Sequence, residues 1–271
     1  MELEVNFYPA TTTNSNPPIL FVHGMAHAAW CWEWKFIPYF NRKGFDCYAV
    51  SLRGHGASMG KNTMRWFRIA DYVNDVKEVL SKIHPTPVII GHSMGGFIIQ
   101  KLLTQGADLP AAVLLSSVPH NGMLRGSVKT ARYFPWQFIK GNLTLSTAPF
   151  SETESIVKTM VFSKDIDADT LSKTQKTLES ESYMAYLDML LLDLHKPKLV
   201  SKPVLFLHGE DDFIVDGNAC AATAKGFGAD FLSMPNMAHD MMLDTRWPEV
   251  AAKILEWLLN KSIYKSPQHG I

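Results

Sequence analysis

The fold of this chain is decided by one stretch, Val88-Ile89-Ile90-Gly91-His92-Ser93-Met94-Gly95-Gly96. An apolar run typical of a buried strand ends here in the pattern Gly-x-Ser-x-Gly, and apolar residues at helical spacing follow at once. Ser93 is therefore predicted to lie at a sharp strand-to-helix corner, with its hydroxyl clear of the sheet as a nucleophile. Gly91 and Gly95 are small enough to let the two arms of that corner pass closely.

Two backbone N–H groups are predicted to face a developing negative charge near Ser93. The N–H of Met94 lies at the expected helix N-terminus, where unpaired donors and the helix dipole favour an anion. A second apolar strand, 19–22, ends at His23-Gly24-Met25-Ala26, and we assign the second donor by position to the N–H of Met25. Gly24 is predicted to contact the substrate, and His23 to brace the loop.

Composition limits the classes of partner. Lys and Arg together number 26, equal to Asp and Glu, so the chain of 271 residues has no excess of basic charge to bind nucleic acid or an anionic membrane. Small neutral molecules are therefore favoured as the partners of this chain. The N-terminal segment lacks the apolar run of a signal peptide, and no stretch reaches the roughly 18 apolar residues of a membrane span. We therefore expect a cytoplasmic protein.

Neither a metal nor an organic cofactor is predicted. Cys31, Cys47 and Cys220 are scattered without metal-ligand spacing, and buried reduced thiols are expected. The Gly54-x-Gly56 pair lacks the third glycine of a dinucleotide-binding loop, because Met59 stands in its place.

Strand-like runs recur along the chain with helical patterns between most of them, as in a parallel sheet covered on both faces. The runs are 3–8 (an edge strand), 19–22, 45–50, 88–92, 111–115, 204–207 and 231–234. The clearest helical spacing covers 69–83 and 250–259. The predicted class is α/β.

The alternation of strand-like and helical segments stops between residues 122 and 200, where no strand-like run occurs and short amphipathic helices are expected. We predict a helical cap at 122–200, inserted between two parts of one core, 1–121 and 201–271. Its apolar side chains are predicted to line a substrate pocket. The candidates are Trp136, Met184 and Met189, together with Phe134, Phe138, Tyr186 and Leu190.

A serine hydroxyl needs a base to accept its proton, and the base needs an acid that fixes its tautomer. In this kind of fold the three residues follow one another along the chain as serine, acid and histidine. Only His239 and His269 come after the last predicted strand, and His239 is predicted to be the base. Asp211, Asp212 and Asp216 compete for the acid. Adjacent aspartates on an extended loop point in opposite directions, so the pattern leaves this choice open.

Over nearly its full length, the chain resembles the α/β-hydrolase superfamily. The resemblance rests on His23-Gly24, Arg53-Gly54-His55-Gly56, the segment 91–96, Gly209-Glu210-Asp211-Asp212 and His239-Asp240. It implies an α/β-hydrolase fold and favours Asp212 as the acid, since the family's acid usually stands third after the glycine, with Asp211 second.

The segment 23–32 also resembles the plant methylesterase and hydroxynitrile-lyase branch. The lyases there typically have threonine where this chain has Gly24, and cysteine where it has Met94. These two departures favour ester hydrolysis over cyanohydrin chemistry.

The predicted function is hydrolysis of a small to medium, largely apolar ester or lactone through an acyl-enzyme, with Ser93, His239 and Asp212 as the triad. Three other functions are compatible with the same fold. A hydroxynitrile-lyase-like enzyme would use the same triad, although the departures at Gly24 and Met94 count against it. A C–C bond hydrolase would need a basic clamp for a carboxylate, and a small-molecule receptor would show little turnover. The clamp candidates are Arg53, Arg125, Lys129 and Arg132.

Overall fold

The computed structural model of the chain describes residues 1–12 and 16–264. Its centre is a seven-stranded sheet with the strand order β1-β3-β2-β4-β5-β6-β7. All neighbouring strands are parallel except β1, which pairs antiparallel with β3 at the edge. The strands are β1 (Glu4–Tyr8), β2 (Ile19–Val22), β3 (Cys47–Ser51), β4 (Val88–His92), β5 (Ala112–Leu115), β6 (Val204–Gly209) and β7 (Asp230–Met234).

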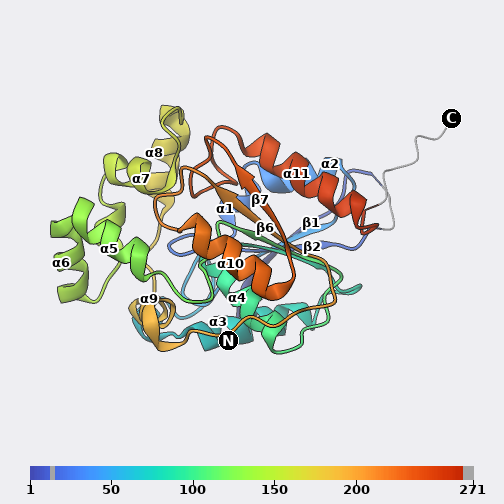
Figure 1. Cartoon of the computed structure of the whole chain (residues 1–271), viewed down its shortest axis with the longest axis horizontal. Coiled ribbons are helices and arrows are strands. Elements are labelled where there is room, and N and C mark those ends of the chain that lie inside the picture. The colour runs from blue at the N-terminus through green and yellow to red at the C-terminus, as the bar shows by residue number, and fades with distance from the viewer. Residues whose placement is uncertain (13–15, 265–271) are drawn as a thin grey trace.

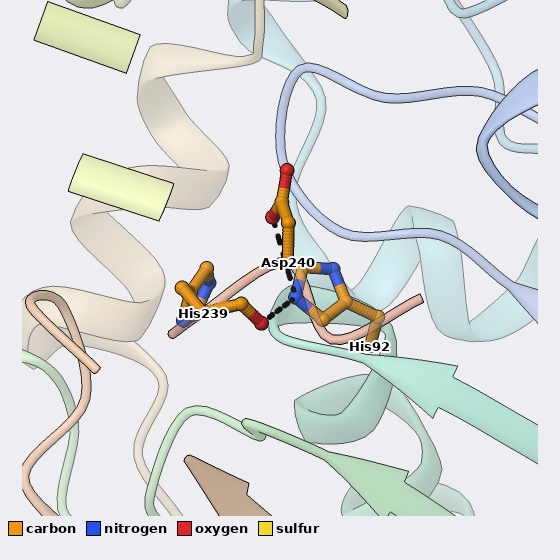
Figure 2. Close-up of side chains that lie close together, drawn as sticks. All are labelled: His92, His239 and Asp240. Atoms are coloured by element: carbon orange, nitrogen blue, oxygen red, sulfur yellow. Dashed lines mark hydrogen bonds and ion pairs between the residues drawn. The ribbon is translucent and has the colours of Figure 1, made fainter. Parts of the chain in front are cut away.

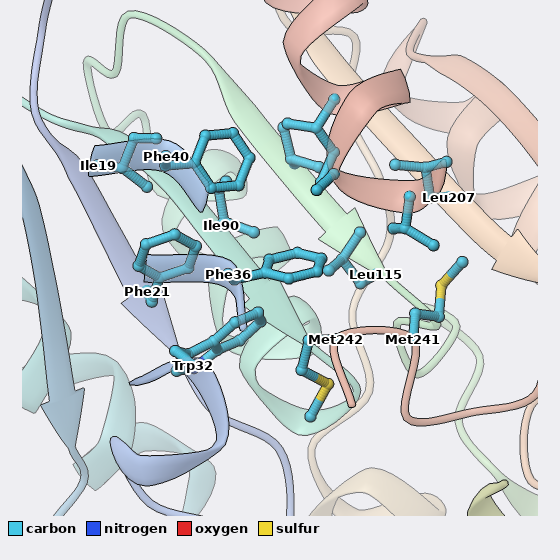
Figure 3. Close-up of a cluster of buried hydrophobic side chains, with 14 of the residues drawn as sticks. Ile19, Phe21, Trp32, Phe36, Phe40, Ile90, Leu115, Leu207, Met241 and Met242 are labelled. Atoms are coloured by element: carbon cyan, nitrogen blue, oxygen red, sulfur yellow. The ribbon is translucent and has the colours of Figure 1, made fainter. Parts of the chain in front are cut away.

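The central strands are buried on both faces because helices cover both sides of the sheet (Figure 1). On β2, Ile19 and Phe21 point to one apolar layer, while Leu20 and Val22 point to the other. Figure 3 shows the first layer, where Trp32 packs against both Phe21 and Phe36. This alternation is the period of two expected for a strand between two helical layers.

Six helices that lie outside residues 116–203 pack in these layers. In the first layer are α1 (Trp30–Glu33), α2 (Phe36–Arg42) and α11 (Trp247–Asn260); in the second are α3 (Ile69–Leu80), α4 (Met94–Thr104) and α10 (Gly217–Phe227). The 3-10 helix η1 (Lys61–Trp66) precedes α3. The predicted helix at 69–83 is three residues too long, since α3 ends at Leu80 ahead of His84-Pro85, where proline disfavours helical backbone at the preceding residue.

A helical insertion lies between β5 and β6 and extends beyond one end of the sheet (Figure 1). Across residues 116–203, all of which are described, the structure contains no strand. The insertion consists of α5 (Leu124–Tyr133), α6 (Pro135–Thr144), η2 (Ala148–Ser151), α7 (Glu154–Val161), α8 (Ala168–Thr177), α9 (Tyr183–Leu187) and the π-helical turn η3 (Asp188–Leu192). These elements fall inside the predicted range 122–200.

The three cysteines are all buried and free, as predicted. Among the helices of the described ranges, none combines the length and apolar character needed to cross a membrane. His269 lies outside the described residues.

Candidate active site

Ser93 occupies the corner between β4 and α4, as the sequence predicts. Its backbone has φ 51° and ψ −112°, a combination that few residues other than glycine adopt. The Ser93 N–H donates to the carbonyl of Leu115 at 2.9 Å, which ties the corner to β5. A Cβ on Gly91 would lie 2.7 Å from the carbonyl carbon of Gly95, and a Cβ on Gly95 would lie 2.4 Å from the carbonyl oxygen of Val22. Neither position has room for a Cβ atom, so both residues must be glycine.

Three predicted side chains form one hydrogen-bonded row. Nε2 of His239 lies 3.0 Å from Oγ of Ser93, and its Nδ1 lies 2.8 Å from Oδ2 of Asp212. The other carboxylate oxygen of Asp212 accepts the N–H groups of Ile214 and Val215, at 2.8 and 2.9 Å. The row is buried, and residues 93, 212 and 239 follow three separate strands, β4, β6 and β7.

The geometry distinguishes the three candidate acids. Asp211 is exposed to solvent, and Asp216 caps α10 by accepting the N–H of Ala219 at 2.9 Å. Only Asp212 among the three contacts the imidazole of His239.

Charge couples the two buried partners of this row. Burial alone would lower the pKa of His239, but the neighbouring Asp212 carboxylate offsets this effect and raises the pKa above its ordinary value. Burial alone would raise the pKa of Asp212, and the charge and hydrogen bond of His239 lower it instead. The pair thus favours an ionised carboxylate next to a basic imidazole.

The two predicted oxyanion donors lie on the loops that flank Ser93. Met94 is the first residue of α4, and Met25 follows β2 by three positions. Within residues 1–12 and 16–264, neither N–H donates a hydrogen bond, so both are available to an incoming oxygen. His23 braces the Met25 loop as predicted, because its Nδ1 lies 2.8 Å from the Gly24 carbonyl and its Nε2 accepts the Leu52 N–H at 2.9 Å.

Gly24 has a different role from the predicted contact with substrate. It is absent from the residues that line the cavity, and a Cβ at this position would lie 2.7 Å from Nδ1 of His92 and 3.0 Å from Cβ of Ser93. Its small size lets the Met25 loop approach the Ser93 corner.

An apolar cavity lies between the insertion and Ser93 and encloses about 1070 Å³ of atom-free space, counting the part open to solvent. Ser93 and His239 lie in its wall beside side chains of the insertion. Most of the surface of that wall is apolar, and the insertion contributes polar groups from Ser127, Thr130, Asn142, Ser146, Thr147 and Ser151. The large apolar and aromatic residues of the wall are Met25, Met123, Phe138, Phe150, Val157, Met160, Val161, Leu178, Tyr183, Tyr186 and Ile214.

The three pocket predictions made for the cap are wrong. Trp136 is 68% exposed, Met189 is fully buried in the apolar layer that contains α4, and Met184 is half-buried without lining the cavity. Phe138 and Tyr186, from the wider set, do line it. On α6, Trp136, Ile139 and Leu143 are exposed while Phe138 lines the cavity, so packing rather than periodicity decides which apolar side chains of that helix turn inward.

Three polar side chains in the same cavity wall were not predicted from the sequence as site residues: His27, His92 and Asp240. Nε2 of His92 donates to the His239 carbonyl at 3.0 Å and lies 3.6 Å from Oδ1 of Asp240 (Figure 2). His27 contacts Oδ2 of the same carboxylate at 3.1 Å. Burial lowers the pKa of His92 to about 3, so this ring is neutral and holds the backbone of His239.

Ligand atoms from His92, His239 and Asp240 lie within 4.8 Å of one another, a spacing that could hold a metal ion. Both ring nitrogens of His239 already face Ser93 and Asp212, however. The donor set therefore fits a hydrogen-bond network better than metal coordination.

Residues 19–253 match the family model described as "Alpha/beta hydrolase family". The chain belongs to the alpha/beta hydrolase family. It is 26% identical over 255 residues to a pimeloyl-[acyl-carrier protein] methyl ester esterase of Nitrosospira multiformis, covering 87% of this chain and 92% of the relative. It is 32% identical over 91 residues to the pFDCC methylesterase MES16 of Arabidopsis thaliana, about a third of either chain.

A solved alpha/beta hydrolase structure resembles the whole chain. The putative non-heme bromoperoxidase BpoC of Mycobacterium tuberculosis superposes with a TM-score of 0.77, covering 98% of this chain and 97% of the other at 18% sequence identity. This likeness confirms the predicted fold. The matches with esterases of the family support a hydrolase role for this chain.

Proposed function

We propose that this alpha/beta hydrolase cleaves a small to medium, largely apolar carboxylic ester or lactone through an acyl-enzyme at Ser93. The observation that carries the proposal is the row from Ser93 through His239 to Asp212, which opens into an apolar cavity. Related chains are named as methyl ester esterases, which agrees with this chemistry.

In the proposed mechanism, Oγ of Ser93 attacks the ester carbonyl while Nε2 of His239 accepts its proton. Asp212 keeps the His239 proton on Nδ1 and stabilises the imidazolium that forms. The N–H groups of Met25 and Met94 stabilise the oxyanion. His239 then protonates the leaving alcohol, and later activates the water that releases the acid and restores Ser93.

The cavity favours a neutral acyl group. Of the described residues that line it, none is Lys or Arg. The four clamp candidates lie elsewhere: Arg53 pairs with Asp71 and Asp75, Arg125 pairs with Asp216, Lys129 covers the Phe213 ring and Arg132 is exposed. An ester hydrolase is therefore preferred over a C–C bond hydrolase of carboxylate substrates.

A matched pair of esters tests this preference. Methyl hexanoate and monomethyl adipate differ in whether the chain ends in a methyl group or a carboxylate. We expect kcat/KM at pH 7.5 to be about 100-fold lower for monomethyl adipate, because an unpaired carboxylate loses its hydration in an apolar cavity. Equal values would mean that a cation reaches the acyl chain.

Turnover separates an enzyme from a receptor of the same fold. The test is hydrolysis of p-nitrophenyl esters of graded chain length, with a vinylogous diketone assayed in parallel. The proposal predicts many ester turnovers per protein molecule and slow or no cleavage of the diketone. A single stoichiometric release would indicate a receptor, and faster diketone cleavage would indicate a C–C bond hydrolase.

The pH profile tests the role of His239. The base must be neutral at Nε2, and its pKa is raised, so we expect kcat/KM to fall about tenfold per pH unit on the acid side of a midpoint above 6.5. Activity should be constant above that midpoint. Enzyme returned to pH 8 after each exposure serves as the control for stability, and a flat profile from pH 5 to 8 would contradict the assignment.

A further inference from the structure

Residues 179–181 of the insertion hold the loop that carries Met25. The N–H of Glu179 donates to the Ala26 carbonyl at 2.8 Å, and the N–H of Ala26 donates to Oε2 of Glu181 at 3.3 Å. Ala26 has φ 62°, in the left-handed region that favours glycine. A residue other than glycine keeps this conformation only where its surroundings fix it. Here the insertion binds both polar backbone atoms of Ala26.

The Glu181 side chain is itself fixed in place. It is fully buried and forms an ion pair with Nε2 of His55 at 3.1 Å. Its Oε1 accepts the hydroxyl of Tyr72 at 2.8 Å and the N–H of Ser182 at 2.6 Å. Burial would lower the pKa of His55 and raise that of Glu181, but their mutual attraction reverses both shifts, which supports an ionised pair.

The neighbouring peptide groups of this loop are held from the other side. Nδ1 of His23 lies 2.8 Å from the Gly24 carbonyl, and Nδ1 of His27 lies 2.7 Å from the Met25 carbonyl. The backbone from the Gly24 carbonyl to the Ala26 carbonyl is thus anchored at every polar group except the Met25 N–H. That group is the proposed oxyanion donor.

We propose that Glu181 is a positioning residue for the oxyanion hole: its buried carboxylate, paired with His55, holds Ala26 so that the Met25 N–H points at the reacting oxygen. The inference rests on the proposed function. The insertion would then help to position an oxyanion donor in addition to lining the cavity. Glu181 does not line the cavity, so its loss should act on kcat rather than on KM.

The test compares two buried carboxylates of the insertion. Glu181→Gln removes the charge that pairs with His55. The control, Asp188→Asn, removes the partner of Arg68, which also joins the insertion to the core but does not contact residues 24–26. Loss of one oxyanion donor typically costs 100-fold or more, so displacing one should cost part of this. We expect kcat on methyl hexanoate to fall about 30-fold in Glu181→Gln, with KM within about twofold, and to fall less than about threefold in Asp188→Asn.

Equal losses in the two variants would reduce Glu181 to a structural link and overturn the proposal, as would unchanged kcat or a loss confined to KM. If Glu181→Gln does not fold, as judged by circular dichroism, Tyr72→Phe decides instead. It removes one hydrogen bond from Oε1 and leaves the ion pair, and we expect about a fivefold lower kcat. Wild-type kcat in Tyr72→Phe would then overturn the proposal.

A second readout separates this inference from the choice of substrate. A fluorophosphonate probe reacts with an activated serine, and its phosphoryl oxygen takes the oxyanion position. If the wild type is labelled at Ser93 but does not hydrolyse esters, the proposed substrate class fails while Glu181 can still be tested. Labelling should be about 30-fold slower in Glu181→Gln and near the wild-type rate in Asp188→Asn.

Discussion

Ser93→Ala is expected to lower kcat/KM for ester hydrolysis by at least about 10⁴-fold and to leave the fold intact. The substitution deletes the oxygen that lies 3.0 Å from Nε2 of His239, and without it the base has no hydroxyl to activate. Only one buried atom is lost, and the Ser93 N–H keeps its bond to Leu115. Steady-state kinetics and thermal unfolding measure the two effects.

Ser116→Ala is the matched control. Ser116 is also a buried serine with positive φ, 42°, at the end of the neighbouring strand β5, and its hydroxyl has no hydrogen-bond partner in the described part of the chain. We expect wild-type activity in this variant. Full activity in Ser93→Ala, or equal loss in both variants, would mean that the nucleophile lies elsewhere.

Asp212→Asn is expected to cost about 10⁴-fold in kcat with little change in KM. In the wild type, Oδ1 of Asp212 accepts the N–H groups of Ile214 and Val215, so the amide oxygen of an asparagine would take this place. Its NH₂ group would then face Nδ1 of His239. The imidazole would have to carry its proton on Nε2 and could not accept the proton of Ser93.

The control for this change is Asp211→Asn, one residue earlier in the same loop. Asp211 is exposed, so we expect kcat within about threefold of the wild type. The reverse ranking of the two variants would transfer the role of the acid to Asp211.

The sequence carried enough information to predict the sheet and the Ser93 corner because both depend on local patterns. Apolar runs bounded by turns predict the central strands, and Gly-x-Ser-x-Gly between a strand and a helix predicts the corner. The acid could not be chosen in this way. The choice depends on the direction of adjacent side chains, and in the structure the N–H groups of Ile214 and Val215 help to orient Asp212 toward His239.

The residues of the cavity wall and the supporting polar contacts could not be predicted from the sequence, for a different reason. Trp136 and Phe138 are both apolar residues of α6, and only the packing of that helix turns Phe138 inward and leaves Trp136 exposed. Contacts such as Ala26 with Glu181 and His27 with Asp240 join residues more than 150 positions apart. No local periodicity encodes such pairs.

The proposed mechanism depends most on a covalent intermediate at Ser93. The direct measurement is mass spectrometry of wild-type protein quenched with acid during hydrolysis of p-nitrophenyl hexanoate, followed by peptide mapping. The proposed mechanism predicts a hexanoyl group on the peptide that contains Ser93, and no such group in Ser93→Ala. A hexanoyl group on another residue that forms and decays at the rate of turnover, or continued turnover in Ser93→Ala, would contradict it.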